Sequence, residues 1–286
     1  MGHGDLGSGV GRGIIGFSVS LISGSTHPCP IGLVRPQSGA ALVVDERWCF
    51  DAWTGRLRSL SADLPESRWP PRGWTLYQDA AREIVYAPFD WTNEAARVAL
   101  VGITPGRHQG WVASMEAAAA LRCGGSADEA LRRAKSVASF SGSMRRNLVT
   151  MLDGIGLAGT LGIASCDDLF GSAHGLATHL SALAFPVFQN GRNYAGAKIT
   201  SDPVFVALIR QVLAAQLLQA AHALIVPLGN AAAEAVGLLI AEGVIDPARC
   251  MLGFPHPSGA NGHRHAQFEA RRVELAAAVS RWYESD

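Results

Sequence analysis

The sequence predicts an α/β fold in which a central sheet of four mostly parallel strands lies between two layers of helices. From about Trp74 onward, short apolar runs alternate with helical stretches rich in Ala and Leu. Two of the apolar runs end at a glycine, as is typical of buried parallel strands. With 286 residues, 48% of them hydrophobic, the chain is long enough to bury the core of such a domain.

Apolar runs predict the strands, and apolar residues at helical spacing predict the helices. The strands are expected at residues 98–104, 177–185, 223–229 and 250–256. The helices are expected at residues 126–137, 143–155, 204–221, 231–241 and 267–283. Ser126 is the expected N-cap of the first helix, with Glu129 completing a capping box, and Asn230 is the expected N-cap of the fourth. The carboxyl ends of parallel strands meet at one edge of a sheet, where ligands bind.

Composition divides the chain into three regions. Residues 1–40 are rich in Gly, Ser and Pro without a sustained period, which predicts a low-complexity, poorly ordered extension. Residues 41–80 are predicted to pack on the main domain through their large side chains, which are Trp48, Phe50, Trp53 and Trp69. Residues 81–286 carry the alternating strands and helices and are predicted to form the main domain.

Charge and cysteine content exclude several classes of protein. The formal net charge is zero, so any contact with nucleic acid has to be local. The five scattered cysteines include no C-x-x-C pair, so neither a metal nor another cofactor is predicted. Their odd number favours free or buried thiols in a reducing cytoplasm. No apolar stretch reaches the length of a membrane span, and we expect a cytoplasmic monomer without membrane contact.

The first candidate site is the loop Gly102-Ile103-Thr104-Pro105-Gly106, which directly follows the first predicted strand. Its two glycines let the backbone approach a ligand closely, and its proline fixes one backbone angle. The loop would present the side chain of Thr104 at the strand end. The backbone N–H groups of Gly106 and Arg107 would point into the pocket.

The second candidate site is the loop His256-Pro257-Ser258-Gly259-Ala260-Asn261, which follows the last predicted strand. Prolines on both sides of His256 stiffen the loop. His256 would donate a hydrogen bond to an oxygen that gains negative charge as a bond breaks, and Ser258 would bind a phosphate. Residues two apart do not meet as nucleophile and base, so this loop does not indicate a serine hydrolase.

Together with three segments between them, the two loops resemble the signature motifs of the uracil-DNA glycosylase superfamily over roughly residues 85–286. The landmarks, in the order found in that family, are residues 102–106, 139–145, 178–183, 228–233 and 256–258. Residues 186–194 also resemble a motif of a bacterial subgroup described only as glycosylase-like. The resemblance implies a uracil-DNA glycosylase-like fold, with residues 81–286 as the catalytic domain.

The resemblance implies a monofunctional DNA glycosylase. Such an enzyme flips a nucleotide out of single- or double-stranded DNA into a closed pocket. It hydrolyses the bond to the base and leaves an abasic site. The base would be uracil-like or a modified pyrimidine, including a hypermodified phage base, and the role would be DNA repair or anti-phage defence.

The resemblance also assigns roles to individual residues. Thr104 would orient the attacking water, and His256 would stabilise the departing base. Contacts to the base are expected from Phe140, His179, Ser181, Gly106, Arg107 and Asn190. Contacts to DNA are expected from Ser258, Gly259, Ala260, Asn261, Arg264 and Arg145. Phe140 would stack on the base, and basic residues that follow the strands would gather at one face to bind phosphates.

Three positions depart from the family pattern. Thr104 stands where well-known members carry Asp or Asn, so it can orient water but cannot act as a carboxylate base, a contribution worth about 10²–10⁴-fold in rate. The Asn that reads the uracil edge in other members is missing from the second predicted strand. Ala260 stands where a larger apolar residue often fills the gap in the duplex, which implies either weak intercalation or a single-stranded substrate.

Two other functions stay open on the sequence. One is a DNA- or nucleotide-binding protein that keeps the glycosylase fold with weak catalysis or none, and Thr104 is the residue that raises this alternative. The other is an unrelated α/β hydrolase or nucleotide-binding enzyme. It is disfavoured because the sequence has no P-loop, no Gly-x-Ser-x-Gly elbow and no cluster of metal ligands.

Overall fold

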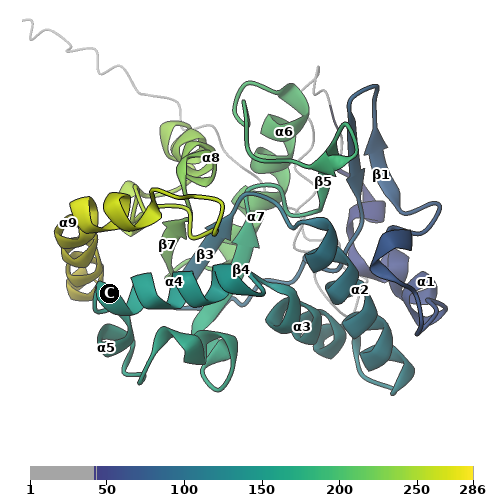
Figure 1. Ribbon diagram of the computed structural model, residues 1–286, viewed down its shortest axis with the longest axis horizontal. Coiled ribbons are helices and arrows are strands. Elements are labelled where there is room, and N and C mark those ends of the chain that lie inside the picture. The colour runs from purple at the N-terminus through teal and green to yellow at the C-terminus, as the bar shows by residue number, and fades with distance from the viewer. Residues whose placement is uncertain (1–41, 43, 286) are drawn as a thin grey trace, which may run out of the picture.

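The molecule is built around two sheets that lie side by side (Figure 1). The computed structural model describes residue 42 and residues 44–285, so the predicted extension at residues 1–40 lies outside the described part. One sheet has three parallel strands, and the other has four antiparallel strands. The predicted α/β class with a parallel sheet is confirmed, whereas the antiparallel sheet was not predicted.

The parallel sheet consists of β3 (Val98–Gly102), β4 (Ala177–Ser181) and β7 (Leu224–Pro227), with β3 in the middle. The first residue of β3 lies opposite the first residue of each neighbour, so the three carboxyl ends meet at one edge. All residues of β3 are buried. The chain leaves β3 toward β4 and later returns to the other side as β7, and open α/β sheets form a ligand crevice where the connections diverge in this way.

The fourth predicted strand, residues 250–256, is extended chain rather than a strand. It runs beside β7, where Met251 donates its N–H to a carbonyl of β7 (2.9 Å) and Gly229 donates to the carbonyl of Phe254 (2.8 Å). The ladder stops after one bridge because Gly253 adopts a φ of +88° and a proline near the end of the segment has no N–H. The prediction of a four-stranded parallel sheet is therefore wrong by this strand.

The antiparallel sheet is made of very short strands. In spatial order they are β1 (Thr75–Gln78), β2 (Arg82–Val85), β5 (Val187–Gln189) and β6 (Arg192–Asn193). Strands this short show no clear alternation of apolar and polar residues in the sequence. The predicted strand 177–185 ends early, at Ser181, and the chain then crosses from the parallel sheet to β5.

All five predicted helices are present, whereas α1, α2 and α5 were not predicted. The α-helices are α1 (Thr54–Arg58), α2 (Arg107–Arg122), α3 (Ala127–Ala138), α4 (Ser143–Gly154), α5 (Leu157–Leu161), α6 (Pro203–Leu208), α7 (Ala214–Gln219), α8 (Asn230–Ala241) and α9 (Arg264–Ser285). A π-helical turn, Ile209–Leu213, joins α6 to α7. Short 3-10 helices are Glu46–Trp48, Phe50–Trp53, Glu66–Arg68, Cys166–Phe170, His174–Leu176 and Pro247–Arg249.

The predicted helices are confirmed as α3, α4, the α6–α7 run, α8 and α9, and the side chain of Ser126 caps α3 as expected. Asn230 is instead the first residue of α8, which Gly229 precedes as N-cap.

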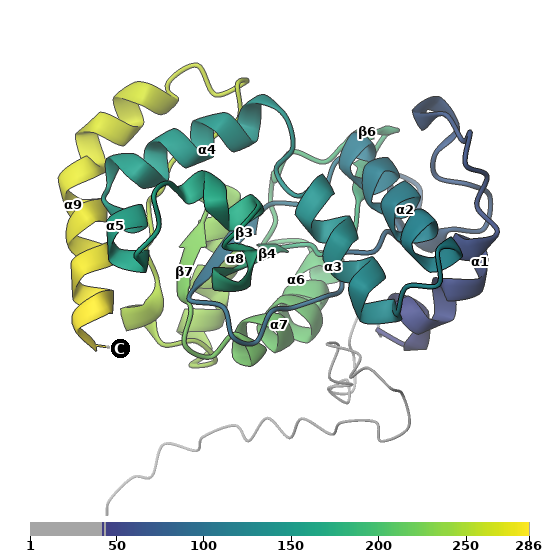
Figure 2. The same cartoon turned by 90° about the horizontal axis from the view of Figure 1, so that it is seen from below.

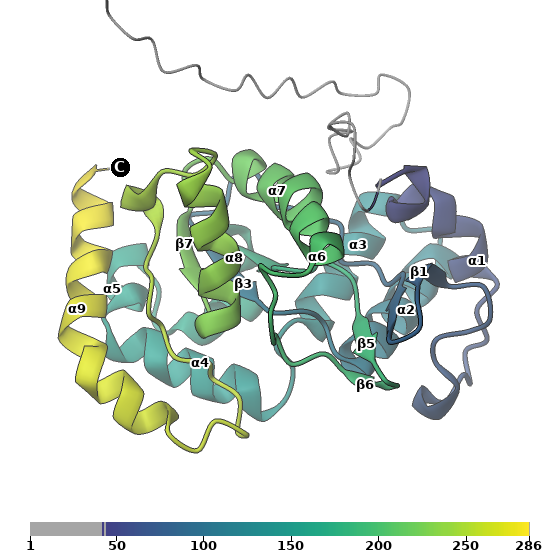
Figure 3. The same ribbon diagram turned by 90° about the horizontal axis from the view of Figure 1, so that it is seen from above.

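Helices cover both faces of the parallel sheet (Figures 2 and 3). Val98 and Leu100 of β3 pack with side chains of α4, α5 and α9. Ala99 and Val101, which alternate with them, pack with side chains of α2, α3 and the α6–α8 region. Successive side chains of a strand point to opposite faces of the sheet, so β3 contributes residues to two separate cores.

The aromatic-rich segment after residue 44 packs against the antiparallel sheet. Trp53 stacks on Tyr86 with ring centroids 4.5 Å apart and an angle of 1° between the planes. Trp69 lies against Gly110 of α2. Only a glycine fits at this position, because an added Cβ would lie 2.3 Å from the Trp69 ring. These side chains are buried in the same core as the α2 and α3 helices.

The cysteines differ in part from the expectation. Cys123, Cys166 and Cys250 are free thiols, whereas Cys49 is disulfide-bonded. The expectation of thiols throughout is therefore wrong at Cys49, and the cysteines no longer argue for a reducing compartment. Within the residues that the structure describes, no helix is long and apolar enough to cross a bilayer.

Candidate functional site

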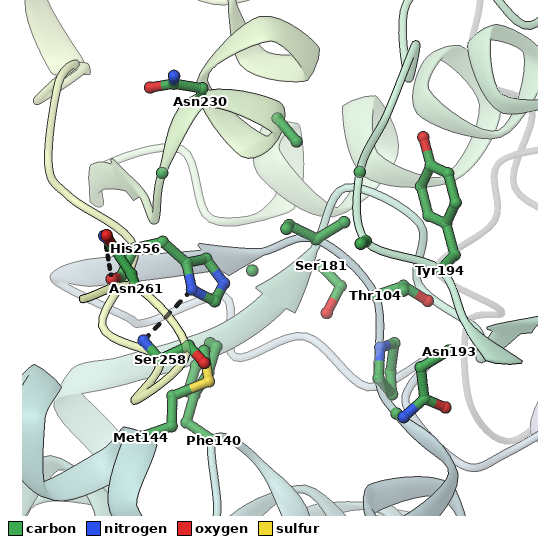
Figure 4. A pocket seen from close by; sticks show the side chains of 18 of the residues that line it. Thr104, Phe140, Met144, Ser181, Asn193, Tyr194, Asn230, His256, Ser258 and Asn261 are labelled. Atoms are coloured by element: carbon green, nitrogen blue, oxygen red, sulfur yellow. Dashed lines mark hydrogen bonds between the residues drawn. The ribbon is translucent and has the colours of Figure 1, made fainter. Parts of the chain in front are cut away.

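A pocket of about 970 Å³ opens at the carboxyl ends of the three parallel strands (Figure 4). The loop after β3, the end of β4 and the start of α8 form part of its wall. The segment around β6 and the loop that contains His256 complete the wall. Both candidate loops of the sequence therefore face one pocket, and its volume lies in the range usual for small-molecule and cofactor sites.

Two glycines let pocket side chains approach the strand ends. A Cβ on Gly102 would lie 3.0 Å from a ring carbon of Phe140, and a Cβ on Gly229 would lie 2.7 Å from the Cβ of His256. Gly229 also adopts a φ of +83°, which residues with a side chain rarely adopt. These glycines place Phe140 against the end of β3 and His256 against the end of β7.

The imidazole of His256 is oriented by its own loop. The backbone N–H of Ser258 donates to Nδ1 of His256 (3.3 Å), and the side-chain amide of Asn261 donates to the His256 carbonyl (3.1 Å). Because Nδ1 accepts, the neutral ring carries its proton on Nε2, on the side of the ring that Figure 4 shows reaching into the pocket. Burial lowers the pKa of His256 and favours this neutral form. His256 thus offers the pocket a hydrogen-bond donor.

Thr104 can only accept a hydrogen bond from a ligand or a water. Its hydroxyl donates to the carbonyl of Phe185 (2.8 Å), which follows β4. The remaining lone pairs of the oxygen lie on the pocket wall. The geometry therefore fits the orientation of a water molecule, as predicted for Thr104, and gives it no part as a proton donor.

Phe140 lies at the pocket wall in a strained backbone conformation. Its φ is +52°, and only 5% of the residue is exposed. Its ring meets His179 edge-on (centroids 5.9 Å apart) and Phe170 edge-on (6.4 Å). A side chain held at such a positive φ is often found at a functional site. Only a small part of the ring faces the pocket.

Of the two predicted base readers on β4, Ser181 is the better placed. It ends the strand opposite Gly102, and Figure 4 shows its side chain inside the pocket. Its hydroxyl makes no hydrogen bond with any described residue and is free to bind a ligand. His179 lies deeper, stacked on Phe170 at 4.6 Å, and its buried Nε2 has no partner among the described residues.

We expect the substitution His179→Phe to make the protein more resistant to acid. Burial lowers the pKa of His179 from 6.5 to about 3, and the charges of Lys135 and Arg145 act in the same direction. Below pH 6.5 the unfolded chain thus binds a proton that the folded protein does not bind. Stability is fully present above pH 6.5 and is lost as the pH falls toward 3, by up to about 1.4 kcal/mol per pH unit.

Urea unfolding at a series of pH values below 6.5 measures this slope. The phenylalanine keeps the stack on Phe170 and removes both the titration and the unpartnered nitrogen. The same substitution at the exposed His222 is the control and should leave the slope unchanged. An equally steep loss of stability in His179→Phe and the wild type would contradict the prediction.

The expected backbone donors of the first loop are already occupied. The N–H of Gly106 donates to the side chain of Gln109 (2.9 Å), and the N–H of Arg107 donates to the side chain of Asn193 (3.0 Å). The Arg107 guanidinium donates to the Trp69 carbonyl. The prediction that these two N–H groups face a ligand is therefore wrong, because neighbouring side chains accept both.

Arg145 also differs from its predicted role as a DNA contact. Its guanidinium donates to carbonyls at the end of α3, among them those of Ser136 (3.0 Å) and Ser139 (2.7 Å). It also lies 4.5 Å from the centre of the Phe170 ring. Arg145 thus stabilises the turn that carries Phe140. Its guanidinium binds these carbonyls and the Phe170 ring, whereas it was predicted to bind a DNA phosphate.

The remaining predicted DNA contacts are divided between the pocket and its surroundings. Ser258, Ala260 and Asn261 line the pocket, whereas Gly259 is exposed beside it. Arg264, at the start of α9, donates to the carbonyl of Asn261 (3.3 Å). Asn190, which was predicted to contact the base, is exposed at the turn between β5 and β6 and does not line the pocket.

Several lining residues were missed from the sequence. They are Met144, Asn193, Tyr194, Asn230, Glu234 and Gln267. Among the described lining residues, Glu234 is the only carboxylate, and Lys198 and Arg271 are the only Lys or Arg side chains. The resemblance at residues 186–194 was the signal that could have identified Asn193, which lies within that stretch.

Comparison with known proteins gives one informative match. No known family model matches the chain, and no solved structure matches it. The chain is 35% identical over 241 residues to a Bacillus subtilis (strain 168) protein named "Uncharacterized protein YoxB". The match covers 83% of this chain and 94% of that protein. At this identity and coverage, the chain belongs to the same protein family as YoxB of Bacillus subtilis.

Proposed function

We propose that this protein is a monofunctional DNA glycosylase with a uracil-DNA glycosylase-like fold. It would excise a uracil-like or modified pyrimidine, including a hypermodified phage base, from extruded DNA. The observation that carries the proposal is the Nε2–H donor of His256, held in the pocket that Thr104 and Phe140 also line. This combination suits a reaction in which a base departs with negative charge.

The proposed chemistry follows from the positions of these groups. The bond between the sugar C1′ and the base nitrogen breaks, and its electron pair moves onto the base and its carbonyl oxygen. The Nε2–H of His256 stabilises that oxygen, while a water held by the Thr104 oxygen adds to C1′. One water proton ends on the departed base, which leaves a hydroxyl on the sugar and completes the balance.

The absence of a carboxylate at position 104 predicts slow turnover. Thr104 cannot take the water proton, and general-base help is worth about 10²–10⁴-fold. A base that leaves more easily would compensate for this loss. We therefore propose a substrate whose base is a better leaving group than uracil, acting in the cytoplasm in DNA repair or anti-phage defence.

An excision assay tests the proposal. The purified protein is incubated with oligonucleotides that carry uracil, other deaminated or damaged bases, or glucosylated hydroxymethylcytosine, in single- and double-stranded form. Alkali then cleaves any abasic site, and strand breaks are counted on a denaturing gel. Breaks at the modified position of at least one substrate are expected. No breaks on any substrate, together with no free base by mass spectrometry, would reject the enzyme.

A DNA- or nucleotide-binding protein without catalysis is the second candidate. The observation that favours it is the Thr104 hydroxyl, which is bonded to the Phe185 carbonyl in place of a free carboxylate. This candidate predicts saturable binding of the same oligonucleotides, without abasic sites at any enzyme concentration. The excision assay and a binding titration on one set of oligonucleotides therefore separate the two functions.

A further inference from the structure

We infer that Asn147 is a positioning residue for His256, and that it acts through the peptide group that joins Pro257 to Ser258. Asn147 lies on α4 and donates its side-chain N–H to the carbonyl of Pro257 (2.8 Å). It does not itself line the pocket. The inference rests on the proposed function, because it explains how the donor of His256 is kept on the side of the ring that faces the pocket.

The loop that contains His256 lies between α4 and α9 (Figure 2). On the side of α9, Asn261 donates to the carbonyl of His256 (3.1 Å) and to the side chain of Gln267 (3.0 Å). On the side of α4, Asn147 donates to the next carbonyl, that of Pro257. Two consecutive carbonyls of the loop are thus held by amide side chains from opposite sides.

The carbonyl of Pro257 depends on Asn147. Pro257 is buried, and because proline has no N–H, the carbonyl is its only backbone hydrogen-bonding group. Among the residues that the structure describes, Asn147 is the one donor to this carbonyl. Removal of the donor would leave a polar atom of a buried residue unpaired, unless the peptide group turned to find another partner.

The peptide group that Asn147 holds also orients the imidazole of His256. A trans peptide is planar, so the carbonyl of Pro257 and the N–H of Ser258 point in opposite directions and turn together. That N–H donates to Nδ1 of His256 in a rather long hydrogen bond (3.3 Å), which Figure 4 shows. By holding the carbonyl end of the plane, Asn147 keeps the N–H end on Nδ1.

The tautomer of His256 follows from the orientation of this peptide. While Nδ1 accepts the N–H, the neutral ring carries its proton on Nε2, which reaches into the pocket. If the peptide turned over, the Pro257 carbonyl would face Nδ1, and Nδ1 would carry the proton in order to donate to it. Nε2 would then present a lone pair to the oxygen that gains negative charge, which would repel that oxygen. Asn147 therefore keeps the donor in the pocket.

The substitution Asn147→Leu tests this role, because it removes the donor and keeps a side chain of similar size. NMR of protein with isotope-labelled histidine reports which ring nitrogen carries the proton. Spectra are recorded at about pH 8, well above the lowered pKa of the His256 ring. A His256→Gln sample identifies the His256 signals among those of the nine histidines. We expect the proton on Nε2 in the wild type and largely on Nδ1 in Asn147→Leu.

The same variant should release the base about tenfold to 10²-fold more slowly at nearly unchanged oligonucleotide affinity, since small misplacements of a reacting group have effects of this size. Thr150→Val is the matched control. It removes another hydrogen bond of α4, from the Thr150 hydroxyl to the Arg146 carbonyl (3.0 Å), at an exposed site outside the pocket. It should keep both the tautomer and the rate.

A His256 ring that keeps its proton on Nε2 in Asn147→Leu would overturn the inference, and so would a wild-type ring that carries it on Nδ1. If the leucine variant does not fold, Asn147→Asp answers the same question. Its carboxylate keeps the shape of the side chain, repels the Pro257 carbonyl and attracts the Ser258 N–H, so it should also move the proton to Nδ1. A tautomer that depends on Asn147 in a protein without excision would reject only the glycosylase.

Discussion

Replacement of His256 by alanine is expected to slow base release by on the order of 10²–10³-fold, the usual effect of removing one donor to a developing oxyanion. The Nε2–H faces the pocket because Nδ1 accepts the Ser258 N–H. The charge on the base develops only as the bond breaks, so binding of DNA should change little. Single-turnover rates and oligonucleotide affinities, measured on the same substrate, separate these two effects.

Two variants control for the His256 result. His256→Gln retains a side-chain N–H near the position of Nε2 and should lose less activity than the alanine variant. His263→Ala removes an exposed histidine from the same region, outside the pocket, and should keep the wild-type rate. A His256→Ala variant that turns over at the wild-type rate would show that the departing base is stabilised by another group.

Replacement of Phe140 by alanine is expected to lower the free energy of unfolding by about 3–5 kcal/mol, as is usual for a buried phenylalanine. Only 5% of Phe140 is exposed, and its ring fills the space between Gly102 and the rings of Phe170 and His179. Base binding should also weaken, since stacking on an aromatic ring contributes about 1–3 kcal/mol per base. Urea unfolding and anisotropy measure the two effects.

Phe140→Leu separates packing from stacking. Leucine keeps much of the buried volume, so most of the stability should return, while the aromatic surface is still missing. If the leucine variant binds the modified oligonucleotide as tightly as the wild type, Phe140 only supports the pocket and does not stack on the base. Both variants retain Cβ, so neither relieves the positive φ of 52° at this residue.

The parallel part of the fold could be predicted because its residues carry strong local patterns. The run from Val98 to Gly102 is apolar throughout and buried throughout, and the five predicted helices have regular apolar spacing. The last predicted strand was wrong for a conformational reason. Its apolar residues lie beside β7 as expected, but Gly253 and the following proline prevent a regular ladder.

The candidate site could be predicted only in part. Thr104 and His256 lie in loops that the sequence marks by neighbouring glycines and prolines, and Ser181 lies on a predicted strand. Asn193 was missed because its strand has two residues and belongs to a sheet held together by contacts distant in sequence. The role of Arg145 was misjudged because a basic side chain carries no sign in the sequence that nearby carbonyls will occupy it.

The two walls of the pocket belong to different sheets, and this division has a mechanical consequence. His256 lies beside the parallel sheet, whereas Asn193 ends the antiparallel one. The chain between the sheets is anchored where Ala182 donates to the Gly102 carbonyl (2.8 Å). The width of the pocket therefore depends on how the two sheets are placed relative to each other. A ligand that contacts both walls would bind only when the two sheets are correctly placed, and it would therefore stabilise both halves of the molecule against unfolding.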